Sequence, residues 1–234
     1  MPSIVNLDGF KRYAIYYAPE EGSALERFGQ SWFGFDAGTG QELMPERHGV
    51  PEALHARAIA APSRYALHAT MKAPFRPPPG VSGTMIADAL AAFASTQAPV
   101  IAPPLKFVQM DAYLALTTGV PELNALERAV VRALDHCRAP LAEIDYAKRP
   151  ASKLSPRQNQ LMMQVGYPYA LEEFRFHISL AGPLNGAELA KVEQALHPVL
   201  AAEMREPFII RSLALFGDPG DGGKFRLLSR APMR

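Results

Sequence analysis

Cysteine, long apolar runs and net charge are almost absent from this sequence, and each absence excludes a class of protein. The single cysteine, Cys137, has no partner for an internal disulfide. No apolar run approaches the roughly 20 residues of a membrane-spanning helix, and charged residues such as Asp8 and Lys11 interrupt any signal-peptide core. The formal net charge of +1 creates no field that would recruit nucleic acid. We therefore expect a cytoplasmic protein that does not bind membranes.

What the sequence does contain is typical of a packed globular protein. Hydrophobic residues make up 48% of the 234 residues and charged residues 20%. These proportions favour a buried apolar core throughout the chain. The length fits a single domain or two lobes that share a core, and we expect one bilobal domain over residues 1–234.

Apolar periodicity and capping residues predict alternating strands and helices. Cys137 continues the apolar stripe of a helix that starts near Pro121, so we expect a buried thiol and not a reactive one. Residues 44–63 show no clear pattern. The predicted elements are strands at 11–19, 64–72 and 174–181, a hairpin or bent strand at 105–118, a closing hairpin around 217–223, and helices at 23–35, 84–97, 121–139, 156–165 and 186–203.

Two segments repeat one pattern: "HATMKAPF" begins at His68, and "HISLAGPL" begins at His177. Each reads histidine, any residue, hydroxyl, apolar, any residue, small, proline, apolar. Alternation places His68 and Thr70 on one face of the first strand, and His177 and Ser179 on the corresponding face of the second. One His-x-Ser/Thr is a weak signal, but two copies at the same phase of two strands indicate a shared function.

The similarity extends beyond the two short motifs. Residues 64–118 and 173–230 both read as a strand, a helix and two further strands. A unit that occurs twice predicts two lobes related by a pseudo-twofold axis, not a solenoid. The predicted fold class is therefore α+β, with two pseudo-twofold-related antiparallel sheets flanked by helices. This symmetry would place the two polar strand faces opposite each other across a central cleft.

Two facing histidines suit the cleavage of a phosphodiester. Histidine has an ordinary pKa of about 6.5, so at neutral pH one imidazole accepts a proton while the other donates one. An attacking water loses a proton and the leaving oxygen gains one, on opposite sides of phosphorus. His68 and His177 are therefore the candidate acid and base, with neither a metal nor a cofactor required. Which histidine is the base stays open, because that depends on which ester oxygen leaves.

Four further side chains are candidates for binding the substrate. Thr70 and Ser179 follow the histidines by two residues, about 7 Å along each strand, where their hydroxyls would donate to non-bridging phosphate oxygens. Lys72 continues that face and would add positive charge, although a solvated lysine explains it equally well. Ile15 is expected to face the core, which turns Tyr16 toward the other face, to contact phosphate or stack on a sugar. An ordinary tyrosine at the edge of a sheet, with no contact to substrate, explains Tyr16 equally well.

Other chemistries lack their motifs. The remaining histidines have no Cys, carboxylate or HExxH spacing of a metal site; they are His48, His55, His136 and His197. "GDPGDGGKF" is similar to a phosphate-binding loop, but Asp218 stands where the first glycine is needed and Phe225 where Ser or Thr is needed. It therefore predicts a hairpin turn. No Gly-x-Ser-x-Gly elbow is present.

The segment at residues 147–158, "AKRPASKLSPRQ", is strongly basic and contains no acidic residue. Ser155 and Gln158 within it have the spacing of a capping box, which supports the helix at 156–165. The run is equally explained as a solvated loop or as an anion-binding site. Its basic residues are Lys148, Arg149, Lys153 and Arg157.

The pair "HATM" and "HISL" resembles the signature of the 2H phosphoesterase superfamily, whose members carry two His-x-Thr/Ser-x motifs on opposed strands of a bilobal α+β fold. Nearly the whole chain is similar to a bacterial family of that superfamily associated with phosphonate-utilisation gene clusters. The segments that carry this likeness are "RYAIYYAPE", "WFGFDAGTG", "LSPRQNQLMMQVGYPY" and "EEFRFHISLAGPL".

The resemblance implies metal-independent hydrolysis of a cyclic phosphodiester, with His68 and His177 as acid and base. It places Thr70 and Ser179 on the phosphate. It also implies that the substrate is the cyclic phosphate of a small phosphorylated sugar. Ser179 stands where the family more often has threonine, and either hydroxyl donates a hydrogen bond.

Two alternatives accompany this interpretation. The same chemistry would serve an enzyme that processes RNA ends with 2′,3′-cyclic phosphates, and its affinity would then fall steeply with salt. A non-catalytic module that senses a phosphorylated metabolite would bind such ligands without turnover. The expected partner is a small-molecule phosphate ester, and RNA is the less favoured ligand.

Overall fold

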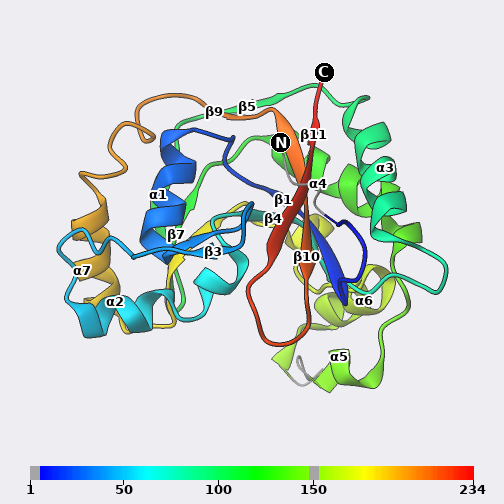
Figure 1. Cartoon of the computed structure of the whole chain (residues 1–234), viewed down its shortest axis with the longest axis horizontal. Coiled ribbons are helices and arrows are strands. Elements are labelled where there is room, and N and C mark those ends of the chain that lie inside the picture. Colours follow the sequence, from blue (N-terminus) through cyan, green and yellow to red (C-terminus); the bar gives the residue numbers. More distant parts are fainter. Residues whose placement is uncertain (1–5, 148–152) are drawn as a thin grey trace.

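Two antiparallel sheets form the framework of a mixed α+β structure. The computed structural model describes residues 6–147 and 153–234. The first sheet, labelled in Figure 1, has the strand order β11–β10–β1–β4. The second has the order β6–β7–β8. The first contains β1 (Arg12–Tyr17), β4 (Ala69–Phe75), β10 (Ser212–Asp218) and β11 (Arg226–Pro232). The second contains β6 (Lys106–Met110), β7 (Tyr113–Thr117) and β8 (Ile178–Ala181).

The two sheets exchange hairpins between the two halves of the chain. The β6–β7 hairpin follows β4 in sequence but pairs with β8, while the β10–β11 hairpin follows β8 and joins the sheet of β1 and β4. Each sheet is therefore assembled from both halves of the chain. Two short pairs complete the strands: β2 (Phe35–Asp36) with β3 (Gln41–Glu42), and β5 (Val100–Ala102) with β9 (Phe208–Ile210).

The helices pack against the sheets in two groups. They are α1 (Ala24–Phe33), α2 (Glu52–Ile59), α3 (Gly83–Ala94), α4 (Pro121–Ala133), α5 (Glu143–Ala147), α6 (Pro156–Val165) and α7 (Gly186–Leu196). Figure 1 shows α1, α2 and α7 on one side of the molecule and α3, α4 and α6 on the other. Contacts agree with this division, because α2 and α7 contact β8 and β7, whereas α3 contacts the β10–β11 hairpin and α4 contacts β4. Within the described residues, no helix has the length and apolarity needed to cross a bilayer.

Capping explains why several predicted helices begin and end where they do. Ser155 and Gln158 form a reciprocal capping box at the start of α6, and Gly166 ends that helix in the left-handed conformation with φ 80°. Asn185 and Glu188 form the same box at the start of α7. Both helix starts predicted from sequence are thus confirmed. The prediction that α7 continues to about residue 203 is wrong, because Pro198 follows its last turn and cannot continue the helix.

The predicted strands at 64–72 and 174–181 are each shorter than expected. Pro62–Tyr65 form a 3-10 turn, and Ala66 after it has φ 56°, so β4 begins only at Ala69. In the other segment Leu171–Glu173 form a 3-10 turn, and β8 begins at Ile178. Both histidines therefore stand immediately before a strand and not within one. Residues 44–63, which showed no clear pattern, contain α2 and the first two residues of the Pro62–Tyr65 turn.

The two faces of β1 belong to different apolar clusters. Ile15 and Tyr17 lie in the main core, and Ala14 and Tyr16 lie in a smaller cluster with Phe216. The prediction that Ile15 faces the core and Tyr16 the opposite side is thereby confirmed. Cys137, which is 2% exposed, is also a core residue as expected.

Candidate functional site

His68 is held by its own backbone at the entrance to β4. Its Nδ1 donates to the carbonyl of Ala66, 3.0 Å away. The same ring lies against Tyr16, with ring centroids 4.0 Å apart, and against Tyr65 at 5.8 Å. Because Nδ1 carries the donated proton, the neutral ring presents Nε2 as an acceptor. That nitrogen lies 3.4 Å from Oγ1 of Thr70.

His177 is held in the same way at the entrance to β8. Its Nδ1 donates to the carbonyl of Arg175, 2.7 Å away and again two residues earlier in the chain. The preceding backbone is fixed by Thr117, whose hydroxyl donates to the carbonyl of Phe176 at 2.7 Å. His177 is half-buried, as is Ser179 two residues later. The two histidines thus share one tautomer and leave the same nitrogen, Nε2, for chemistry.

Both strands also contain an extra residue directly after the hydroxyl residue. On β4, Thr70 pairs with Tyr16 but Lys72 pairs with Ile15, so Met71 is extra. On β8, Ser179 pairs with Ala115 but Ala181 pairs with Leu114, so Leu180 is extra. Such bulges bend a strand and re-aim the side chains beside them. The two motifs are therefore alike in backbone form as well as in sequence.

One cavity of about 400 Å³ collects most of the predicted site residues. Thr70 enters it from β4, and His177 and Ser179 enter it from the β8 side. His68 adjoins the cavity through its contact with Thr70. The remaining wall contains aromatic and apolar side chains, among them Met71, Tyr113, Val131, Tyr167 and Phe174. The cavity has the size and mixed lining expected for a small-molecule site.

Burial keeps the imidazole of His68 neutral at neutral pH. Loss of water around the ring lowers the pKa of His68 to about 4; the hydrogen bond to Ala66 opposes this shift, and nearby His177 adds to it. At neutral pH the ring is therefore uncharged and able to accept a proton. The backbone of Ala66, at φ 56° and ψ −175°, is itself strained for a residue with a Cβ atom, and such outliers gather at functional sites.

The expectation that Lys72 shares a face with His68 is wrong, because the bulge turns it to the other side of β4. Lys72 is 3% exposed, and its Nζ donates to the carbonyl of Val131 at 3.1 Å and to Asp135 Oδ1 at 3.0 Å. Burial lowers the pKa of Lys72, against the opposing influence of Asp135. Lys72 contributes to the cavity wall, but its ammonium group is bound to α4 and the turn after it.

Tyr16 lies beside His68, on the face that the sequence indicated. It is 1% exposed, and its neighbours in the chain's smaller apolar cluster include Phe216 and Phe225. Burial raises the pKa of Tyr16 well above its usual value, so the phenol keeps its proton. Its ring lies between His68, at a centroid distance of 4.0 Å, and Phe216, at 5.1 Å.

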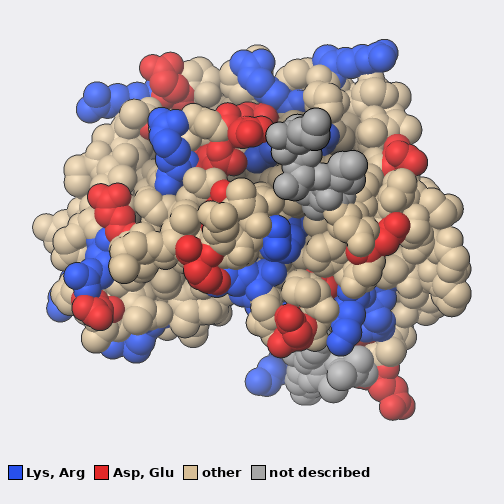
Figure 2. Space-filling view, viewed as in Figure 1, with Lys and Arg blue, Asp and Glu red and all other residues tan. Residues whose placement is uncertain are grey.

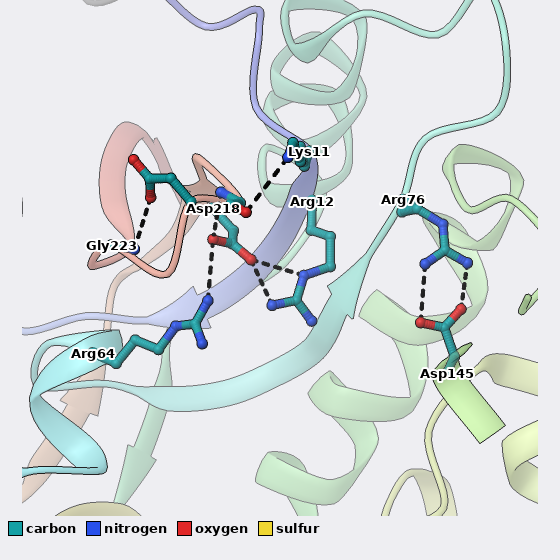
Figure 3. A network of polar contacts seen from close by, with 9 residues as sticks. Lys11, Arg12, Arg64, Arg76, Asp145, Asp218 and Gly223 are labelled. Atoms are coloured by element: carbon teal, nitrogen blue, oxygen red, sulfur yellow. Dashed lines mark hydrogen bonds and ion pairs between the residues drawn. The ribbon is translucent and has the colours of Figure 1, made fainter. Parts of the chain in front are cut away.

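A network of charged side chains fixes the turn that precedes His68 (Figure 3). Arg12 Nε donates to Asp218 Oδ2 at 2.8 Å, and Arg64 Nη2 lies 3.5 Å from Asp218 Oδ1. Asp218 is 1% exposed, and although burial opposes its ionisation, hydrogen bonds from Arg12 and Gly220 hold its pKa below the ordinary range. The network ties β1 and the end of β10 to the 3-10 turn that carries Arg64. It therefore supports the position of His68 from outside the cavity.

Sequence reasoning missed three acidic residues in the cavity wall, Asp111, Glu127 and Glu173, of which Glu127 is the buried one. Glu127 is 2% exposed, lines the cavity, and accepts hydrogen bonds from the N–H of Leu171. Burial raises the pKa of Glu127 to about 7, although the Leu171 N–H and nearby Arg128 and Lys72 oppose the shift. The available signal was its position on the otherwise apolar buried stripe of α4, next to Leu126.

The basic segment presents less free charge than its sequence suggests. Lys148 and Arg149 lie outside the described residues. Arg157 is paired with Glu172. Figure 2 shows lysine and arginine interspersed with aspartate and glutamate over the displayed face, with no broad basic patch there. Among the described residues, no three His, Cys, Asp or Glu side chains are grouped as ligands for a metal ion.

Comparison with known proteins gives a family match over most of the chain. The model of a family described as "Protein of unknown function (DUF1045)" matches residues 70–226. A solved structure from Thermus thermophilus has a TM-score of 0.45 at 14% identity, over 95% of this chain and 98% of that one. A conserved protein of unknown function from Agrobacterium tumefaciens has a TM-score of 0.40 at 15% identity, over 97% and 90%.

Two curated relatives share one name, ribose 1,5-bisphosphate phosphokinase PhnN. The relative from Janthinobacterium sp. (strain Marseille) is 30% identical over 235 residues, and that from Laribacter hongkongensis (strain HLHK9) is 29% identical over 226. The alignments cover 97% and 92% of this chain but 52% and 50% of the relatives. The chain therefore spans about half the length of the curated relatives it matches.

Proposed function

Since the chain belongs to the DUF1045 family, described as proteins of unknown function, we propose its activity from its own site: metal-independent hydrolysis of a small cyclic phosphodiester in the cytoplasm. The observation that carries the proposal is the paired anchoring of His68 and His177. In each, Nδ1 donates to the carbonyl two residues earlier, and a hydroxyl residue and a bulge follow. This supports a bilobal 2H-phosphoesterase arrangement with the substrate between the two motifs.

His68 acts as the base and His177 as the acid in this proposal. A water molecule transfers a proton to Nε2 of His68 as its oxygen bonds to phosphorus. The bond from phosphorus to the leaving ester oxygen breaks, and that oxygen takes a proton from Nε2 of His177. The lowered pKa of His68 supports this assignment, because a base must be unprotonated at working pH.

Thr70 and Ser179 stabilise the charge that develops on the phosphate. Both hydroxyl residues line the cavity, one from each sheet. Hydroxyl donors aimed at the non-bridging oxygens lower the barrier because they are already oriented when the charge develops. Lys72 is not assigned this role, because its ammonium group is held by Val131 and Asp135.

The substrate we favour is the cyclic phosphate of a small phosphorylated sugar, handled in phosphonate catabolism. The names of the two relatives concern a ribose bisphosphate, and the likeness to phosphonate-cluster proteins agrees with them. The kinase reaction in those names is not assigned to this chain, which spans about half of each relative. The sequence also has no phosphate-binding loop, because Asp218 and Phe225 replace two of its required residues.

The test is phosphorus NMR of product formation in EDTA, with ribose 1,2-cyclic phosphate 5-phosphate and nucleoside 2′,3′- and 3′,5′-cyclic phosphates as substrates. We expect turnover of the sugar phosphate by the wild type and its loss in His68→Ala and His177→Ala. His197→Ala is the matched control, because His197 is exposed at the end of α7. Full activity of either site variant would refute the proposal.

The same panel separates the two alternatives. An RNA-end enzyme would prefer the 2′,3′-cyclic nucleotide, and its Michaelis constant would rise steeply with salt. A sensor would bind members of the panel and turn over none of them. The pairing of Arg157 with Glu172 gives the RNA alternative no added support.

A further inference from the structure

Glu127 has more capacity for hydrogen bonding than its contacts within the protein use. Within residues 6–147 and 153–234, the donor to its carboxyl group is the N–H of Leu171, which lies 3.2 Å from Oε1 and 3.1 Å from Oε2. A carboxylate offers about four acceptor sites. Because one N–H is shared by the two oxygens, both keep an acceptor site open to a donor that enters the cavity.

The place where such a donor would arrive is the reaction cavity itself. Glu127 is 2% exposed and lines the same cavity as Thr70, His177 and Ser179. The neighbouring wall includes the apolar side chains of Met71, Val131 and Phe174, which cannot donate hydrogen bonds. A molecule in the cavity is therefore in reach of both the candidate catalytic groups and a carboxyl group whose two oxygens share a single N–H donor.

We propose that Glu127 binds a hydroxyl group of the substrate. The cavity then holds a hydroxylated phosphate ester with its phosphate at the two histidines and its hydroxyl-bearing carbon skeleton against α4. A carboxylate repels a phosphate, which favours this orientation over the reverse. The inference rests on the proposed function and adds the group that selects the carbon skeleton.

Hydroxyl is favoured over ammonium as the group bound by Glu127. Burial raises the pKa of Glu127 to about 7, so both the ionised and the neutral carboxyl are populated near neutral pH. A hydroxyl group both donates and accepts, and it fits either form. An ammonium group fits the ionised form alone, and the positive charge of Lys72 already acts on Glu127.

Glu127 also holds the backbone that leads to His177, so a test must separate recognition from support. Leu171, its donor, has φ 57° and begins the turn that runs toward His177. Loss of support would slow every substrate by the same factor. Loss of recognition would slow a hydroxylated substrate and spare its deoxy analogue.

The experiment compares ribose 1,2-cyclic phosphate 5-phosphate with its 3-deoxy analogue in the wild type, Glu127→Leu and Glu127→Gln. We expect the wild type to prefer the hydroxylated substrate by about tenfold or more in kcat/KM, mainly through KM, and Glu127→Leu to reduce this preference to about twofold. Glu127→Gln should retain an intermediate preference, since an amide still bonds a hydroxyl. Glu122→Gln, exposed in the first turn of α4, is the control and should match the wild type.

Equal losses for both substrates in the Glu127 variants would overturn the inference while leaving the proposed hydrolysis intact. If Glu127→Leu does not fold, an unchanged preference in Glu127→Gln overturns it equally. If the wild type hydrolyses no cyclic phosphate, the proposed function fails, and binding decides the inference instead. Calorimetry with ribose 5-phosphate and methyl phosphate must then show that Glu127→Gln weakens binding of the sugar phosphate alone.

Discussion

The entrances to β4 and β8 present one motif in unequal surroundings. Both histidines donate from Nδ1 to the carbonyl two residues earlier, and both strands have a bulge after the hydroxyl residue. His68, however, is covered by the rings of Tyr16 and Tyr65, whereas His177 lines the cavity directly. Local sequence thus determines how each imidazole is held, while the burial that lowers the pKa of His68 comes from distant parts of the chain.

The groups behind the two strands differ as well. The residue after the β4 bulge is Lys72, whose charge is balanced by Asp135. Its counterpart after the β8 bulge is Ala181, which is fully buried and carries no charge. The approach to β8 is instead supported by Glu127 through Leu171. Two similar motifs are therefore supported by different groups, a lysine–aspartate ion pair behind β4 and a buried carboxyl group before β8.

The largest expected effect is the loss of kcat/KM when either histidine is replaced, and its pH dependence distinguishes the two residues. His68→Ala and His177→Ala should each lower kcat/KM by about 10²- to 10⁴-fold. The wild-type kcat/KM should also fall as pH drops through about 4, because His68 then becomes protonated and stops accepting a proton. His68→Ala should lack this fall, and His177→Ala should keep it. A pH–rate profile of all three proteins checks the assignment, and an acid limb that disappears only in His177→Ala would reverse the two roles.

Removing the two hydroxyl groups should produce the next largest effect. Thr70→Ala and Ser179→Ala should each lower kcat by about 10- to 100-fold, since each removes one donor to the phosphate. Thr70→Ser and Ser179→Thr keep the donor and should stay close to the wild type. Steady-state kinetics tests this, and a loss in Thr70→Ser as large as in Thr70→Ala would show that the methyl group matters instead.

Lys72→Met should affect stability more than catalysis. The variant loses the ammonium group that bonds Val131 and Asp135, although Arg138 still pairs with Asp135. The free energy of unfolding should fall by about 2 kcal/mol. Denaturant unfolding measures this loss, with Lys106→Met as an exposed control on β6. A large loss of kcat at unchanged stability would instead support a role for Lys72 in binding the substrate phosphate.

Glu127→Gln should change the pH dependence of stability by a smaller amount. Burial raises the pKa of Glu127 from 4.5 to about 7, so the folded state holds the proton more tightly than the unfolded state. The wild-type free energy of unfolding should therefore lose this contribution as pH rises from about 4.5 through 7. Glutamine does not titrate, so the variant should gain about 1–2 kcal/mol over the wild type between pH 6 and 8.5. Unfolding curves at both pH values test the sign.

Sequence patterns predicted those features that depend on neighbouring residues. The capping boxes that begin α6 and α7 were visible as spacings, because a cap is formed by side chains three residues apart. The apolar faces of β1 and β8 were visible as alternation. The ends of β4 and β8 were not, because the turn at Ala66 and the hydrogen bond from Thr117 to Phe176 replace the expected ladder.

Residue order was therefore enough to indicate an α+β chain with two matched motifs and to name Thr70, His177 and Ser179, which line one cavity, and His68 beside it. Only the tertiary structure decided which side of β4 carries Lys72, why His68 is neutral, and that Glu127 lies in the cavity wall. The reason is physical. Periodicity and capping act over a few residues, whereas a bulge, the desolvation of a ring and the burial of a carboxyl group depend on segments that are distant in the chain.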